Sequence, residues 1–182
     1  GEYFIVFYGT YIPLQGIEYI LRAFALLPMR ERFHLVMVGK GQVYDEMVKL
    51  CDELKLEDVE FIPRMEYGAL LALVKHADLA LGIFGNTEKA KRVIPNKLQE
   101  PMALGVPVVM GKNAPSERYF KDGEHLYFCE MGNAESLAHA IIHAYDARLD
   151  RERITRNARG VIAQEFSTDK LSDRIRAHLR DW

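Results

Sequence analysis

The residues best suited to bind an anion lie between positions 84 and 100. Lys91 and Arg92 come just before a turn at residues 93–96, and the helical pattern that follows carries Lys97. A helix N-terminus offers free backbone N–H groups and the positive end of the helix dipole, so it suits a phosphate or a diphosphate. Lysine and arginine side chains would add charge-assisted hydrogen bonds. This stretch therefore predicts a phosphate-binding turn.

Glu100 adds a carboxylate to this turn, about one helical turn beyond Asn96 and on the same face. A carboxylate in that place can accept hydrogen bonds from both hydroxyls of a ribose, a use that dinucleotide-binding folds make of an acidic residue. The residues together predict a nucleotide site. The alternative interpretation is a solvated charged loop followed by a surface glutamate.

Other motifs point less clearly to chemistry. Gly39-Lys40-Gly41 resembles the start of a dinucleotide fingerprint, but Tyr44 stands where the third glycine is needed. His139 and His143 are four residues apart on one helical face, with no third metal ligand near them in the sequence. The sequence has no Walker motif, which argues against a P-loop kinase. It also has no GxSxG nucleophile elbow. We therefore predict no metal site, and no residue is assigned a catalytic role.

The elements that must position these residues alternate between strand and helix. Apolar runs predict strands at residues 3–8, 33–38, 59–62, 77–84, 106–110 and 126–129. Apolar residues at helical spacing predict helices between them, with Asn133 and Ser167 as N-caps of two later helices, the last of which continues through Leu171 to Leu179. This order predicts an α/β fold: a doubly wound, Rossmann-like parallel sheet of about six strands, with helices on both faces and a helical C-terminal tail. Ligands bind such sheets beyond the carboxyl ends of the strands.

Composition excludes several classes of protein. The 182 residues are 49% hydrophobic and 27% charged, which is typical of one globular domain. A formal net charge of -2 gives no basic footprint for nucleic acid. Cys51 and Cys129 are too few for a disulfide framework and are interpreted as core thiols in a reducing compartment. We expect no signal peptide, and the sequence contains no apolar run of the roughly 18 residues that a membrane span needs.

Four segments together resemble the C-terminal, donor-binding domain of GT-B-fold glycosyltransferases, most closely the large retaining group 1 family, also called family 4. They are residues 7–17, where the family has a glycine loop, and residues 36–41, 59–64 and 94–109. The last segment, IPNKLQEPMALGVPVV, carries the strongest likeness, and the resemblance covers nearly the whole chain in the same order.

The resemblance implies that residues 1–182 form a single Rossmann-like domain, one half of a GT-B fold, whose N-terminal, acceptor-binding domain is missing. It implies a hexosyltransferase that moves a sugar, with retention, from a UDP- or GDP-linked donor to an acceptor hydroxyl. The expected process is surface polysaccharide or glycolipid synthesis, and the isolated domain is expected to be inactive. No cofactor besides the nucleotide-sugar donor is implied.

Individual positions also carry over from the family. Glu100 matches the second glutamate of the E-x7-E motif, which holds the ribose, and Gly9 matches a glycine whose loop passes near the phosphates. The loop at residues 63–65, which contains Arg64, would border the nucleobase. The turn that carries Ile94, Asn96 and Lys97 would meet the diphosphate.

Three positions depart from the family pattern. Arg92 occupies the place of the first glutamate of E-x7-E, and Thr10 and Gln15 occupy the places of an arginine and a lysine that bind the diphosphate. We expect Arg92, Lys97 or Lys91 to neutralise the diphosphate instead. With these three positions, the predicted donor site comprises Gly9, Thr10, Gln15, Arg64, Arg92, Ile94, Asn96, Lys97 and Glu100.

Two alternatives stay open: a non-catalytic nucleotide-binding module, favoured by the three departures, and a nucleotide-sugar 2-epimerase-like domain with the same two-domain fold. A cytoplasmic location is expected. The arginines of residues 151–180 allow two interpretations, a solvated helical face balanced by acidic residues, which we favour, and peripheral contact with the inner membrane face near a lipid-linked acceptor.

Overall fold

The computed structural model describes residues 2–170, 172 and 176, which form an α/β structure. The strands are β1 (Tyr3–Tyr8), β2 (Phe33–Val38), β3 (Val59–Ile62), β4 (Leu79–Leu81), β5 (Val108–Gly111) and β6 (Tyr127–Cys129). The helices are α1 (Ile17–Ala25), α2 (Tyr44–Glu53), α3 (Tyr67–His76), α4 (Asn96–Leu104), α5 (Ala114–Glu117), α6 (Ala134–Asp146) and α7 (Arg151–Glu165). Short 3-10 turns include η1 (Pro13–Gln15) and η3 (Ala90–Arg92).

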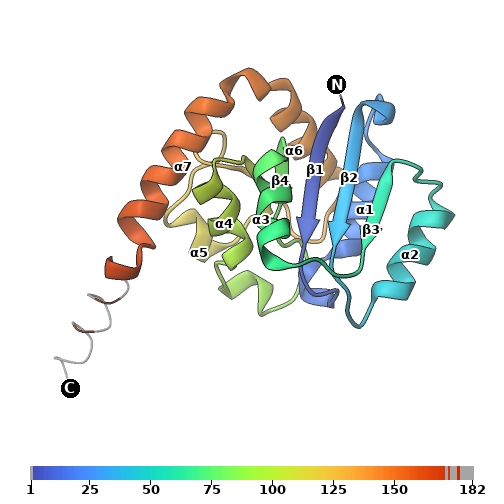
Figure 1. Ribbon diagram of the computed structural model, residues 1–182, viewed down its shortest axis with the longest axis horizontal. Helices are drawn as coiled ribbons and strands as arrows, with labels where there is room; N and C mark the ends of the chain where they lie inside the picture. Colours follow the sequence, from blue (N-terminus) through green and yellow to red (C-terminus); the bar gives the residue numbers. More distant parts are fainter. Residues whose placement is uncertain (1, 171, 173–175, 177–182) are drawn as a thin grey trace.

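The six strands form one parallel sheet in the order β3-β2-β1-β4-β5-β6 (Figure 1). This order confirms the predicted Rossmann-like fold class. The chain winds outward from β1 to β3 and then returns to place β4 on the other side of β1. The loops after β1 and β4 therefore diverge at the switch point, where doubly wound sheets bind their ligands.

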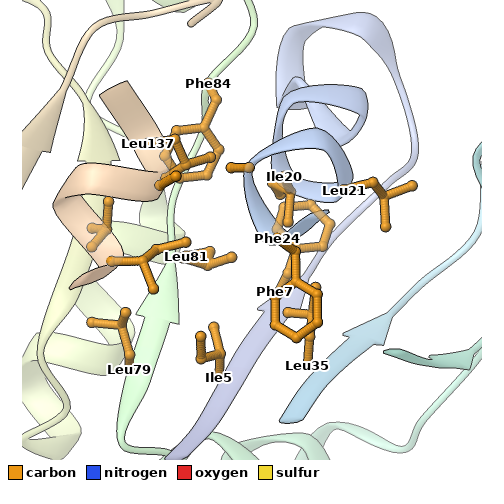
Figure 2. Close-up of a cluster of buried hydrophobic side chains, with 14 of the residues drawn as sticks. Ile5, Phe7, Ile20, Leu21, Phe24, Leu35, Leu79, Leu81, Phe84 and Leu137 are labelled. Carbon is orange, nitrogen blue, oxygen red and sulfur yellow. The ribbon is translucent and has the colours of Figure 1, made fainter. Parts of the chain in front are cut away.

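Helices cover both faces of the sheet because successive side chains of a buried strand point to opposite faces. Ile5 and Phe7 of β1 pack on one face in a cluster with α1, α2 and α6. Figure 2 shows Ile20 and Phe24 of α1 lying over these side chains, with Leu137 of α6 beside them. Val6 and Tyr8 pack on the other face in a cluster with α3, α4 and α7. The β1 strand therefore anchors both cores.

Three predicted strands are longer than the observed ones, and the smallest difference is at β6, which begins at Tyr127 and not at residue 126. The predicted strand at residues 77–84 is assigned only over β4. Gly82 and Ile83 still bond to the backbone of β5, but the N–H groups of Phe84 and Gly85 donate to the carbonyls of Gln15 and Leu14. The predicted strand at residues 106–110 pairs only from Val108 onward. Val106 instead donates to the carbonyl of Pro101 as part of the C-terminus of α4.

The predicted N-caps lie where expected. Asn133 Oδ1 accepts the N–H of Ser136 at 2.9 Å at the start of α6, and Ser167 Oγ accepts the N–H of Lys170 at 3.4 Å. The helix predicted to run on through Leu171, Ile175 and Leu179 lies largely outside the described residues. Within the described part of the chain, no helix has both the length and the apolar character that crossing a bilayer requires.

Candidate functional site

The loop after β1 forms the first part of the site. Gly9 follows β1 and has a φ of +148°. The η1 turn then leads to Gly16, which has a φ of +68° and precedes α1. The N–H of Phe84 donates to the carbonyl of Gln15 at 3.0 Å, so this loop lies across the end of β4. A Cβ at Gly16 would overlap the backbone of Gly85, which explains the glycine at this crossing.

The loop before α4 forms the second part. Asn113, which is buried beyond the end of β5, donates from Nδ2 to the carbonyls of Ala90 and Val93, each at 2.9 Å. These two bonds hold η3 and the following residues against the sheet. Pro95 then serves as the extended N-cap residue of α4, and no side chain caps the helix there. The first turn of α4 also contains no acidic residue, so its positive end is not neutralised locally.

Lys97 joins the two parts. Its Nζ donates to Oε1 of Gln15 at 2.6 Å, across 82 residues of sequence, and lies 4.0 Å from the centre of the Phe7 ring. The side chain is buried over Gly9, where an added Cβ would overlap the ammonium group. The structure therefore brings together Gly9, Gln15 and Lys97, three of the residues predicted from the sequence.

Burial lowers the pKa of Lys97 to about 7, because removal from water disfavours the charged ammonium. The negative charge of Glu100 opposes this effect and raises the pKa. The ammonium form is accordingly less favoured near neutral pH than in a lysine exposed to water. An anion that arrived beside Lys97 would stabilise the ammonium form, so the protonation of this lysine is coupled to anion binding.

Glu100 lies one turn along α4 from Lys97, and both of its carboxylate oxygens are hydrogen-bonded. The hydroxyl of Tyr8 donates to Oε2 at 2.8 Å, and the hydroxyl of Tyr67 donates to Oε1 at 3.1 Å. Tyr8 is the last residue of β1 and Tyr67 the first of α3, so three elements converge on this carboxylate. The cation of Lys97 and the carboxylate of Glu100 stand side by side at the carboxyl end of β1.

The other two predicted cations, Lys91 and Arg92, are paired with Glu88 in the loop before α4. Arg92 pairs with Glu88 at 3.3 Å and is mostly exposed, and Lys91 pairs with the same carboxylate at 3.1 Å. No hydrogen bond or ion pair among the described residues joins Arg92 or Lys91 to Lys97 or Glu100. The cation that the fold builds into the site is therefore Lys97.

The remaining predicted residues make no hydrogen bond to Gln15, Lys97 or Glu100 among the described residues. Thr10 is exposed in the loop after β1, and Asn96 is exposed at the first position of α4. Arg64 is exposed just after β3, three residues before Tyr67. Ile94 is half-buried and packs against the core that includes Leu98 of α4, so its side chain anchors the turn.

Sequence reasoning missed Tyr8, Tyr67 and Asn113. A tyrosine that ends a buried strand carries a hydroxyl that needs a partner, and this is the one signal that could have pointed to Tyr8. The partner itself lies 92 residues away and depends on how β1 and α4 are placed. The sequence placed Asn113 in the loop after β5 but gave no indication of its hydrogen bonds to Ala90 and Val93.

The weaker motifs of the sequence have structural explanations. A Cβ at Gly39 would overlap the carbonyl oxygen of Gly9, so the glycines of Gly39-Lys40-Gly41 allow the loops after β1 and β2 to approach closely. The α2 helix then begins at Tyr44. His143 packs edge-on against Tyr127, and the described residues contain no cluster of three side chains suited to hold a metal ion. Cys51 and Cys129 are buried free thiols.

Comparison with known proteins gives a consistent family assignment. Residues 1–161 match the family model of the group 1 glycosyl transferases. An uncharacterized glycosyltransferase of Methanocaldococcus jannaschii is 26% identical over 94% of this chain and 43% of its own length. LpsE of Rhizobium meliloti, a lipopolysaccharide core biosynthesis glycosyltransferase, is 22% identical over 91% of this chain and 46% of its own length.

The fold also matches solved structures. HepE of Anabaena superposes over 100% of this chain and 49% of its own chain, with a TM-score of 0.84 and 20% sequence identity. That protein has been solved with UDP, with UDP and glucose, and with UDP-glucose. The chain spans about half the length of the curated relatives and of this structural neighbour.

Proposed function

The chain belongs to the group 1 glycosyl transferases, and on this premise we propose that it is the donor-binding domain of a sugar transferase. It binds a nucleoside-diphosphate sugar, and a second domain of the same polypeptide, N-terminal to it, binds the acceptor. The half-length match to its relatives supports this division. The observation that carries the proposal is the paired arrangement of Lys97 and Glu100 at the carboxyl end of β1.

Glu100 and Lys97 bind different parts of the nucleotide. The carboxylate of Glu100 accepts hydrogen bonds from the ribose hydroxyls, in the use that Rossmann-like folds make of an acidic residue. The ammonium of Lys97 and the uncapped N-terminus of α4 stabilise the diphosphate. Gly9, Thr10 and Gln15 border the phosphates, and Ile94 and Asn96 shape the turn before α4. Arg64 borders the base, and Arg92 adds positive charge from the neighbouring loop.

We propose that Lys97 and the N-terminus of α4 stabilise the negative charge of the leaving diphosphate during sugar transfer. The bond between the sugar C1 and the diphosphate oxygen breaks, and a glycosidic bond to the acceptor oxygen forms. The proton of the acceptor hydroxyl passes to the leaving diphosphate or to water. The leaving diphosphate gains negative charge in the transition state, so a fixed cation and a helix dipole lower the barrier. We also propose that the transfer retains the configuration at the sugar C1 and that the isolated domain does not catalyse it.

UDP is the first nucleotide to test, and GDP the second. The UDP complexes of HepE support this choice, and the lipopolysaccharide role of LpsE supports surface polysaccharide or glycolipid as the product. We place the reaction in the cytoplasm, a location that suits the two buried free thiols. A lipid-linked acceptor would bring the protein to the membrane face.

A panel of nucleotides tests the proposal. Thermal unfolding of the chain is measured with UDP, GDP, ADP, CMP and buffer. A ligand at about 100 times its dissociation constant adds roughly 2.7 kcal/mol of stability, and about 2–4 °C of midpoint accompany each kcal/mol in a domain of this size. We expect a shift of several degrees with one nucleoside diphosphate. Equal midpoints in all five samples would contradict the proposal.

Thr10 and Gln15 favour one second candidate, since they stand where the family carries an arginine and a lysine. A nucleotide-binding module without transfer activity would give the same thermal shift. Sugar transfer from the nucleotide donor by the full two-domain polypeptide separates the two candidates.

A further inference from the structure

The carboxylate of Glu100 is held from two sides by tyrosine hydroxyls. Tyr8 donates to Oε2 at 2.8 Å and Tyr67 donates to Oε1 at 3.1 Å. Each oxygen therefore has one hydrogen bond from a different element of the fold. The terminal torsion of a glutamate is soft and broad, so two donors on opposite oxygens fix an orientation that the side chain alone would not keep.

The remaining acceptor positions suit a pair of neighbouring hydroxyls. An ionised carboxylate offers about four lone-pair positions over its two oxygens. With one position on each oxygen taken by a tyrosine, each oxygen retains capacity for a further donor. A vicinal diol supplies two donors at adjacent carbons, one for each oxygen.

The two tyrosines differ in exposure. Tyr8 is 8% exposed, and Tyr67 is 57% exposed. Burial together with the bond to Glu100 raises the pKa of Tyr8, and the bond to Glu100 raises the pKa of Tyr67. Both hydroxyls are thus protonated donors at neutral pH, one fixed inside the core and one at the open side of the site.

We propose that Tyr8 and Tyr67 are positioning residues that orient Glu100 for a ribose diol, with Tyr8 as the fixed partner, and that they make the site prefer ribonucleotides over 2′-deoxyribonucleotides. The inference rests on the proposed function, which supplies the nucleotide. A 2′-deoxyribose offers one hydroxyl to a carboxylate arranged for two. The second acceptor position then loses the partner it would gain from ribose, and the affinity falls.

A first experiment needs no ligand. The ionisation of the tyrosines is followed by NMR with ¹³C at the ring carbon that bears the hydroxyl, in the wild-type chain and in Glu100→Gln. Loss of the carboxylate charge is expected to lower the pKa of Tyr67, because its bond to Glu100 is the largest cause of the raised value. An identical Tyr67 titration in both proteins would overturn the proposed contact.

A second experiment measures selectivity. UDP and 2′-deoxy-UDP are titrated calorimetrically into wild type, Tyr8→Phe, Tyr67→Phe and the control Tyr119→Phe, whose ring packs against Phe166. We expect Tyr8→Phe to weaken UDP binding roughly 3- to 10-fold, as befits one hydrogen bond, and to weaken 2′-deoxy-UDP binding less. The preference for UDP therefore shrinks. Tyr67→Phe should act in the same direction, and Tyr119→Phe should leave the preference unchanged.

The variant Glu100→Ala separates the two proposals. If Glu100→Ala loses UDP binding while Tyr8→Phe and Tyr67→Phe keep both the affinity and the preference for UDP, the tyrosine inference is wrong and the proposed function stands. If the wild-type chain binds no nucleoside diphosphate, or if Glu100→Ala binds UDP as wild type does, the assignment of the site is wrong and the inference falls with it.

Discussion

The ammonium nitrogen of Lys97 lies 2.6 Å from the amide oxygen of Gln15, although 82 residues separate them in the sequence. Gln15 belongs to the loop after β1 and Lys97 to the first turn of α4, so the bond joins the two segments that flank the switch point of the sheet. The cation is held in place before any ligand arrives. In a buried setting, this preorganisation lowers the reorganisation needed when a diphosphate binds.

Replacing Lys97 with methionine should change stability and affinity in opposite directions. Methionine has a similar length and carries no charge to desolvate, so the folded state should gain stability. The diphosphate loses a charge-assisted partner, which predicts a roughly 10- to 100-fold weaker UDP affinity. Thermal unfolding and calorimetry measure the two effects. The matched control is Lys112→Met, since Lys112 is exposed and paired with Glu117. A Lys97→Met chain that is less stable and binds UDP normally would refute this role.

The stability gained by Lys97→Met should depend on pH. The folded pKa of Lys97 is about 7 and the ordinary pKa of a lysine is 10.5, so between these values the unfolded chain binds more protons than the folded one. The free energy of unfolding of the wild type therefore rises with pH across this window. Methionine does not titrate, so the advantage of the variant is largest at pH 7 and below and shrinks toward pH 10.5. Urea unfolding at pH 7 and pH 9.5 measures it. An advantage that grows with pH would contradict the assignment.

UDP binding should weaken as the pH rises above about 7. The diphosphate favours the ammonium form of Lys97, whose pKa is about 7 in the free chain. Above that pH the free chain must take up a proton to bind, so the affinity falls by up to tenfold per pH unit until the pKa of the complex is reached. Calorimetric titrations between pH 7 and pH 9 measure this slope. The Lys97→Met chain should lose it, and a slope retained in that variant would assign the proton to another group.

A methyl group at Gly9 should disrupt the site, whereas one at Gly160 should not. Gly9 has a φ of +148°, and an added Cβ would overlap the ammonium of Lys97. We expect Gly9→Ala to cost about 1–3 kcal/mol through strain and to weaken UDP binding. A Cβ at Gly160, inside α7, would meet no atom within 4 Å, and Gly160→Ala should gain about 0.5–1 kcal/mol from helix propensity. Thermal unfolding of both variants tests this contrast, and equal shifts would speak against it.

Asn113 should prove important although it lies outside the expected binding residues. Its amide donates to the carbonyls of Ala90 and Val93, and its Oδ1 accepts the N–H of Ser116 at 2.9 Å. Asn113→Asp keeps the acceptor and loses both donations. Leaving two carbonyls without their partner should cost about 2–3 kcal/mol and loosen the turn before α4. Thermal unfolding measures the loss of stability, and faster limited proteolysis near residues 88–94 would report the looser turn. Wild-type stability and wild-type proteolysis of Asn113→Asp would show that the loop before α4 does not depend on these hydrogen bonds.

The strands and helices were predictable because their signals are local. The apolar runs at residues 3–8, 33–38 and 59–62 coincide with β1, β2 and β3. The ends of β4 and β5 were not, because Phe84 and Val106 take hydrogen-bond partners outside the sheet that no local pattern reveals. The same limit applies to the site. Glu100 and Lys97 were readable from a motif, but the contact between Glu100 and Tyr8 depends on the placement of β1 against α4.

The most direct test of the account is the UDP affinity of the wild-type chain compared with Glu100→Ala, measured by calorimetry at pH 7. Glu53→Ala serves as control, because Glu53 is a helical glutamate paired with Lys49 at the end of α2. Loss of the carboxylate removes the acceptor for the ribose hydroxyls, which predicts at least a tenfold weaker affinity. Glu53→Ala should bind as wild type does. Equal UDP affinities for Glu100→Ala and wild type would contradict the assignment of this site as the donor-binding site.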